Sequence, residues 1–242
     1  MDFGLNGKRA LVLGGSRGLG AASAAALAAE GVTVLVAARS GDYAVDLADV
    51  SSVQQLIERV KVEGGVDILV NNSGGPKAGP AQGQASQDWL AAFQSMATSL
   101  YAITDALLPQ MIERQWGRVI TVGSSGVVAP IAGLALSNAV RGAIAGWSKT
   151  LASEVAKHGV TVNMVLPGRI DTDRLRELDE GKASRTGASL SAVQQASRNE
   201  IPVGRYGEAS EFGAVVAFLA SQQASYITGS MLRVDGGMIK GL

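Results

Sequence analysis

Short apolar runs alternate with longer segments rich in small residues along the whole chain. Residues 9–13 (RALVL) form an apolar run that ends in glycines, and residues 19–30 (LGAASAAALAAE) have the composition of a helix that stops at Gly31. The next run, residues 32–37 (VTVLVA), is rich in β-branched residues. Repetition of this alternation predicts an α/β fold of the Rossmann type, a doubly wound parallel sheet of about seven strands with helices on both faces.

The individual elements follow from the same pattern. We expect strands at residues 9–13, 32–37, 43–47, 66–70, 118–122, 160–165 and 231–234. We expect helices at residues 19–30, 51–62, 87–115, 136–157 and 210–219, with Pro109 bending the long third helix or ending its first part. Residues 173–200 are charged and polar with weak helical periodicity, so we expect a mobile lid over a pocket. Without a repeat or linker, residues 1–242 are expected to form a single domain.

Composition then removes several classes of function. The absence of cysteine excludes disulfides and thiol catalysis, and a single histidine excludes a cluster of histidine ligands, so we expect no metal site. Acidic and basic residues balance at 21 each, which gives no electrostatic basis for binding nucleic acid. No apolar run reaches the roughly 18–20 residues of a membrane span, and the N-terminus lacks the apolar core of a signal peptide. We therefore expect a cytoplasmic protein.

The junction between the first strand and the first helix is rich in glycine. Glycines there let the backbone approach a pyrophosphate, while the helix N-terminus offers free N–H groups. The pattern alone also fits an ordinary tight turn, but its position between a strand and a small-residue helix favours a dinucleotide site. The expected cofactor-binding residues are Gly14, Ser16, Arg17, Gly18, Leu19 and Gly20.

The end of the second strand indicates which dinucleotide is bound. An acid at this point would accept hydrogen bonds from the adenine ribose, but Ala38 stands there and Arg39 follows. A guanidinium suits a 2′-phosphate, and Arg17 can approach the same group. Arg39 could equally be a solvated loop charge, yet two basic residues and no acid favour NADP(H) over NAD(H).

These features resemble the short-chain dehydrogenase/reductase family over essentially the whole chain. The glycine loop matches the family pattern except at Leu13, where threonine is usual, and Ser40–Asp42 is a short loop where the family usually has a helix. The family's Asn-Asn-Ala-Gly and Pro-Gly…Thr segments have counterparts at residues 71–74 and 167–172, and its C-terminal signature at 218–237. The resemblance implies further cofactor contacts from Asp46, Leu47, Asn72, Ser73, Gly74, Pro167, Gly168, Ile170 and Thr172.

The same resemblance implies a homo-oligomer, most simply a homotetramer. Family members usually pair through two long helices and the C-terminal strand. In this chain the expected contact surfaces are the apolar stretch 238–242 and a helix face with Leu100, Ala102, Ile103 and Leu107, although these residues could equally belong to the core.

The catalytic positions depart from the family. Its asparagine, serine, tyrosine and lysine align with Met96, Ser124, Ser137 and Arg141. Ser137-Asn138 with Arg141 resembles a divergent branch of the 3-oxoacyl-[acyl carrier protein] reductase-like group. Arginine stays protonated and cannot relay a proton, but it can still bind the cofactor ribose or a substrate anion. Ser124 can donate a hydrogen bond to a developing oxyanion.

Two hypotheses about function follow. The first is an NADPH-dependent reductase of a small-molecule carbonyl or activated alkene, in which Ser124, Ser137 and Arg141 form the catalytic site and the proton comes from solvent or substrate. The second is a catalytically inactive NADP(H)-binding relative that acts as a sensor or partner. The tyrosines at 43, 101, 206 and 226 and the single histidine at 158 are expected to be structural and to supply no catalytic acid.

Overall fold

The computed structural model describes residues 2–241 and contains a seven-stranded parallel sheet in the order β3-β2-β1-β4-β5-β6-β7. The expected doubly wound α/β fold is therefore confirmed. The strands are β1 (Arg9–Leu13), β2 (Thr33–Ala38), β3 (Tyr43–Ala44), β4 (Ile68–Asn71), β5 (Gly117–Val122), β6 (Val160–Pro167) and β7 (Met231–Val234). The helices are α1 (Gly18–Ala29), α2 (Val50–Val62), α3 (Ser86–Phe93), α4 (Ser99–Glu113), α5 (Ala135–Val155), α6 (Asp173–Thr186), α7 (Leu190–Asn199) and α8 (Ala209–Ala220).

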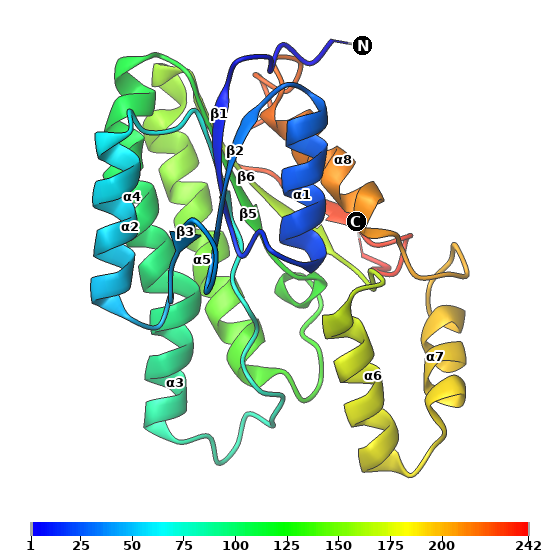
Figure 1. The fold of residues 1–242 in the computed structure, drawn as a ribbon. Coiled ribbons are helices and arrows are strands. Elements are labelled where there is room, and N and C mark those ends of the chain that lie inside the picture. The colour runs from blue at the N-terminus through cyan, green and yellow to red at the C-terminus, as the bar shows by residue number, and fades with distance from the viewer. Residues whose placement is uncertain (1, 242) are drawn as a thin grey trace.

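The sheet is covered on both faces, with α2, α4 and α5 on one side and α1 and α8 on the other (Figure 1). Alternate residues of β1 point to opposite faces, so Leu11 joins the core under α2, α4 and α5 while Val12 joins the core under α1 and α8. Small residues bring α1 and α8 together, since a Cβ on Gly213 would lie 2.5 Å from the Ala22 carbonyl oxygen. The small-residue composition of α1 thus permits its close packing.

The long helix expected at residues 87–115 is divided at a different place. A π-helical turn, Gln94–Thr98, separates α3 from α4, and α4 continues through Pro109. The expectation that Pro109 ends the first part is therefore wrong. Pro109 has no N–H, so the Asp105 carbonyl, four residues earlier, has no hydrogen-bond donor within the helix. Both residues are on the exposed side of α4, so water can satisfy that carbonyl.

The helix face expected to form an oligomer contact is also largely internal. Leu100, Ile103 and Leu107 are only 2%, 0% and 1% exposed and pack in the core against the sheet, and only Ala102 of that set is on the surface. Their helical spacing therefore marks the side of α4 that packs on the sheet.

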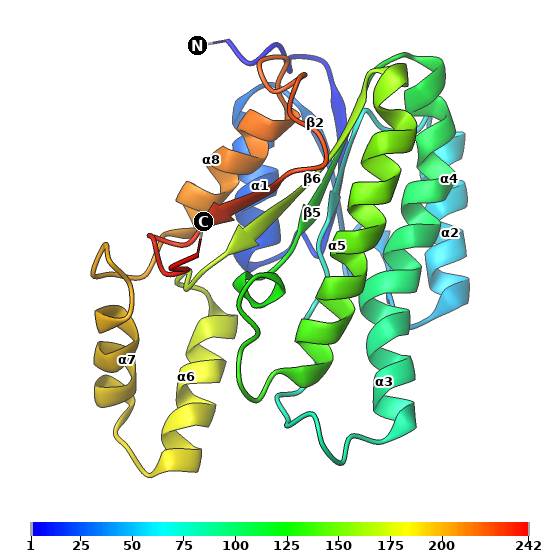
Figure 2. The same cartoon turned by 180° about the vertical axis from the view of Figure 1, so that it is seen from behind.

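The carboxyl ends of the strands carry the loops that matter for function. Residues 173–200 fold into two helices, α6 and α7, which project beyond this end of the sheet (Figure 2). The connection between β2 and β3 is short and contains no helix, as expected. Among the described helices, none has the length and apolar character needed to cross a bilayer.

Candidate functional site

The glycine loop after β1 has a backbone that side chains would disrupt. Gly14 and Gly18 have φ angles of +59° and +55°, in the left-handed region. A Cβ on Gly20 would lie 2.2 Å from the Gly14 carbonyl oxygen, so helix α1 begins in direct contact with the loop. Arg17 is the N-cap of α1 and its side chain makes no capping bond, which leaves first-turn N–H groups for a ligand. The cradle fits a diphosphate.

Neighbouring segments border this cradle. The Asn72 side chain donates to the Gly14 carbonyl over 3.2 Å, so its amide braces the loop. The methyl group of Thr172 lies 3.7 Å from where a Cβ on Gly18 would stand. The buried Ser73 hydroxyl, in the same loop after β4, has no hydrogen-bond partner among the described residues. An orphaned polar atom at the edge of the cradle is consistent with a polar ligand, because buried hydroxyls are ordinarily paired.

The adenine end of the expected site lies beside β2 and β3. Arg17 and Arg39 are both exposed, and neither forms an ion pair within residues 2–241. The Gly15 amide donates to the Ala37 carbonyl over 3.3 Å, which ties the glycine loop to the strand that presents Arg39. Arg17 before α1 and Arg39 after β2 are therefore two exposed cations that are available to an anion.

Two hydrogen bonds hold the segment that follows the short edge strand β3. The exposed Asp46 carboxylate accepts from the Ala48 amide over 2.9 Å, and the Ser99 hydroxyl donates to the carbonyl of half-buried Leu47 over 2.7 Å. Three other expected contacts are placed less distinctively. Ser16 of the glycine loop and Gly74 after β4 are exposed, and Leu19 packs partly on the core between α1 and α8.

The nicotinamide side of the expected site follows β6. The Gly168 amide donates to Val234 over 2.9 Å, and Ile170 is buried and bridges to Gly207. Thr172 then caps α6, its hydroxyl accepting from the Leu175 amide over 3.4 Å. The segment from Pro167 to Thr172 is thus held against β7 and α6, next to the glycine loop.

Ser124 lies directly after β5 and retains a hydrogen to donate. Its Oγ accepts a hydrogen bond from the Gly126 amide over 3.0 Å, which orients the side chain and leaves the hydroxyl proton free. Asn138 approaches the same point, since a Cβ on Gly126 would lie 2.5 Å from its Oδ1 and 3.3 Å from the Ser124 Oγ. Asn138 also binds both backbone groups of Ile131. Ser137 is half-buried, without a hydrogen-bonded side chain in the described contacts.

Arg141 is the most unusual group in the site. It is 9% exposed, and its Nη1 donates to the Val122 carbonyl at the end of β5 over 2.7 Å. Burial, and secondly the nearby charge of Arg174, lower the pKa of Arg141 to about 10. It therefore remains a cation near neutral pH, and no carboxylate within residues 2–241 pairs with it.

Arg174 was not identified from the sequence. It lies in the first turn of α6 and its Nη2 donates to the Pro76 carbonyl, in the loop after β4, over 3.0 Å. Nothing in the charged segment 173–200 distinguishes Arg174 from its other basic residues, because only the tertiary structure brings one of them to β4.

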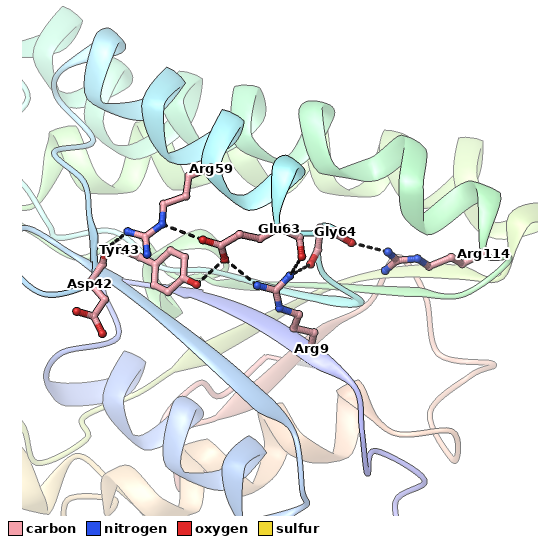
Figure 3. A network of polar contacts seen from close by, with 8 residues as sticks. Arg9, Asp42, Tyr43, Arg59, Glu63, Gly64 and Arg114 are labelled. Atoms are coloured by element: carbon pink, nitrogen blue, oxygen red, sulfur yellow. Dashed lines mark hydrogen bonds and ion pairs between the residues drawn. The ribbon is translucent and has the colours of Figure 1, made fainter.

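Tyr43 is committed to a charged network at the amino end of β1 (Figure 3). Its hydroxyl donates to Glu63 over 2.6 Å, which raises the Tyr43 pKa, and the Arg59 guanidinium lies 4.2 Å from its ring centroid. Glu63 also accepts from Arg9, the first residue of β1, over 2.8 Å. Tyr43 therefore links edge strand β3 to the residue that follows α2 and, through it, to the start of β1.

The other groups expected to be structural are engaged elsewhere. Tyr101 stacks on Trp147 at a centroid distance of 4.4 Å, Tyr206 donates to Asp179 over 2.7 Å, and Tyr226 is fully exposed. Met96 is 1% exposed in the π-helical turn, where it packs under α5. The described arrangement thus offers a serine and an arginine at the carboxyl end of β5.

The comparisons with known proteins identify the family of this chain. Residues 14–239 match the family model described as enoyl-(acyl carrier protein) reductase. The chain is a member of the short-chain dehydrogenase/reductase family. It is 37% identical to the 3-oxoacyl-[acyl-carrier-protein] reductase FabG of Salmonella typhimurium, covering 96% of this chain and 97% of that one. For the same enzyme of Escherichia coli the identity is also 37%, over 98% and 99%.

Solved members of the short-chain dehydrogenase/reductase family show the same fold. L-sorbose reductase from Gluconobacter frateurii, in complex with NADPH and L-sorbose, superimposes with a TM-score of 0.93 at 31% identity over 100% of both chains. A variant of actinorhodin polyketide ketoreductase with NADPH gives 0.88 at 30% identity, over 96% of this chain and 97% of that one. Both neighbours are complexes with NADPH.

Proposed function

We propose that this protein is an NADP(H)-dependent reductase of a small molecule, acting on an activated alkene or a carbonyl. The observation that carries the proposal is the adjacency of a complete dinucleotide cradle to Ser124 and Arg141 at the carboxyl end of β5. The reductases among its relatives support the same reaction type.

The chain's own residues provide the cofactor site. The glycine loop and α1 receive the diphosphate, Arg17 and Arg39 receive the 2′-phosphate, and the segment from Gly168 to Thr172 borders the nicotinamide. When bound, NADPH supplies a hydride to an electrophilic carbon of the substrate. NADP(H) is accordingly the cofactor that these residues select.

The remaining residues act on the oxygen of the substrate. Ser124 donates to an oxygen that becomes negative as hydride arrives, and Arg141 supplies a positive charge beside it. Neither group is a suitable acid near neutral pH, because a serine hydroxyl is far too weak and Arg141 has a pKa of about 10. Protonation of a carbon atom by solvent needs no acidic side chain. We therefore favour conjugate reduction of an activated alkene over reduction of a carbonyl.

Stereospecifically deuterated NADPH tests the proposal. Incubation with a panel of ketones and activated alkenes, followed by NMR, shows where deuterium is bound in the product. Label at an alkene-derived carbon is the expected result, whereas label at a carbinol carbon would make the protein a carbonyl reductase. Tight NADPH binding without label transfer in a single turnover would favour the alternative, a non-catalytic NADP(H)-binding sensor or partner.

The homotetramer expected from family resemblance stays a prediction. The outer faces of α4 and α5 form a surface hollow of about 260 Å³ lined by Tyr101, Ala102, Asp105, Leu108, Trp147 and Leu151, which gives these two helices a partly apolar surface. We expect light scattering at micromolar concentration to give a multiple of the 24.7 kDa chain mass. A monomeric mass would contradict the prediction.

A further inference from the structure

Two guanidinium groups come together over neighbouring strand ends. Arg141 reaches from α5 to the carbonyl of Val122, the last residue of β5, over 2.7 Å. Arg174 reaches from α6 to the carbonyl of Pro76, in the loop after β4, over 3.0 Å. Strands β4 and β5 are adjacent in the sheet, and Ser124 follows β5 directly. The two cations therefore lie at the ends of β4 and β5, near Ser124, where the substrate oxygen is expected.

Their charges are poorly balanced by the protein. The acceptor of Arg141 is a neutral carbonyl, and the nearby charge of Arg174 disfavours the cationic form of Arg141 further. Arg174 pairs with Glu177 at 3.3 Å, but both side chains are about half exposed, where an ion pair contributes little. Three nearby acids are engaged with different arginines: Asp171 and Asp173 with Arg176, and Asp179 with Arg169.

We propose that Arg141 and Arg174 together bind a carboxylate of the substrate, next to the group that accepts hydride. The inference rests on the proposed function and adds a substrate class, small unsaturated or oxo acids. A guanidinium fork matches a carboxylate in shape and charge, and at buried Arg141 a charge-assisted pair is stronger than it would be in water. Arg174 reaches this edge from α6, and we assign it the role of selecting substrates that carry a carboxylate.

The same anion chemistry could come from the cofactor diphosphate, so the test separates the two sources. Calorimetry first measures NADP⁺ binding to wild type, Arg174→Gln, Arg174→Lys and the control Arg176→Gln, an exposed arginine of the same helix. The NADP⁺-loaded proteins are then titrated with monomethyl fumarate, a monoanion, and with dimethyl fumarate, its neutral diester. No turnover is needed, because both measurements are of equilibrium binding.

We expect wild type to bind the monoanion more tightly than the diester by roughly ten- to a hundred-fold, the range for one or two charge-assisted contacts. Arg174→Gln should remove most of that preference, Arg174→Lys should restore part of it, and Arg176→Gln should leave it intact, all with unchanged NADP⁺ affinity.

Four results would overturn the inference. They are equal binding of the two probes by wild type, an intact preference in Arg174→Gln, an equal loss in Arg176→Gln, and a loss of NADP⁺ affinity in Arg174→Gln, which would assign the anion to the cofactor. Failure of wild type to bind NADP⁺ would instead overturn the proposed function itself.

Discussion

The cofactor cradle and the substrate edge are built in different ways. In the cradle, glycines and backbone carbonyls are in contact, as where a Cβ on Gly20 would meet the Gly14 carbonyl at 2.2 Å. At the substrate edge, long or polar side chains from separate elements converge, with Ser124 after β5, Arg141 on α5 and Arg174 on α6. The cradle is therefore intolerant of added atoms, while the substrate edge depends on the identity of a few side-chain groups.

The largest effect is expected where the cradle has no room. Gly20→Ala places a methyl group against the Gly14 carbonyl and the Asn72 amide, so NADPH binding should fall below detection, with a loss of about 1–3 kcal/mol of stability from overpacking. Calorimetry and thermal unfolding measure both. The control is Gly142→Ala on the exposed face of α5, where nothing lies within 4 Å. It should keep NADPH affinity and gain about 0.5–1 kcal/mol. Intact NADPH binding by Gly20→Ala would show that the cradle is adaptable.

The next effect concerns the oxyanion donor. Ser124→Ala should reduce kcat by about 10²–10³, the cost of removing one donor to a developing oxyanion. Ser137→Ala should cost far less, because the Ser137 hydroxyl is too short to reach the same oxygen. Single-turnover rates with the substrate found by deuterium transfer compare the two variants directly. Equal losses of rate in the two variants would show that Ser137 also takes part in the reaction, and would contradict this prediction.

A smaller effect is expected at the adenine end of the cradle. Arg39→Ala should weaken NADPH binding by roughly ten- to a hundred-fold, because it removes one charge-assisted contact to the 2′-phosphate. NADH lacks that phosphate, so its affinity should not change. Titration of both cofactors against wild type and variant checks this. Equal affinity of the wild type for NADH and NADPH would show that Arg39 is only a solvated charge.

The smallest effect concerns the carboxylate of Glu211, in the first turn of α8. Glu211 binds Arg205 through both carboxylate oxygens, at 2.7 and 2.8 Å, and accepts from the Glu208 amide. These contacts, Arg205 first, lower its pKa to about 2. Because the folded pKa lies below the unfolded value, this stabilisation is complete above about pH 4.5 and is lost as pH falls toward 2. Glu211→Gln should therefore flatten the fall of Tm between about pH 5 and 2. The exposed Glu154→Gln is the control, and an equal effect there would contradict the assignment.

The sequence by itself determined the sheet, most of its helices and the glycine cradle. Short continuous apolar runs, a helix of small residues and the glycine-rich junction between them are local patterns, so they can be identified without coordinates. The sequence also located Ser124, Ser137 and Arg141, through spacing along a recognisable family pattern.

Only the tertiary structure decided which cations meet at the substrate edge. Arg174 is 33 residues from Arg141 along the chain, and its approach to Pro76 depends on how α6 leaves β6, which no local pattern encodes. The same holds for the π-helical turn at Gln94–Thr98 and for the inward face of Leu100, Ile103 and Leu107. In each case packing between distant segments selects the conformation, because the local preferences of these residues are too similar to decide it.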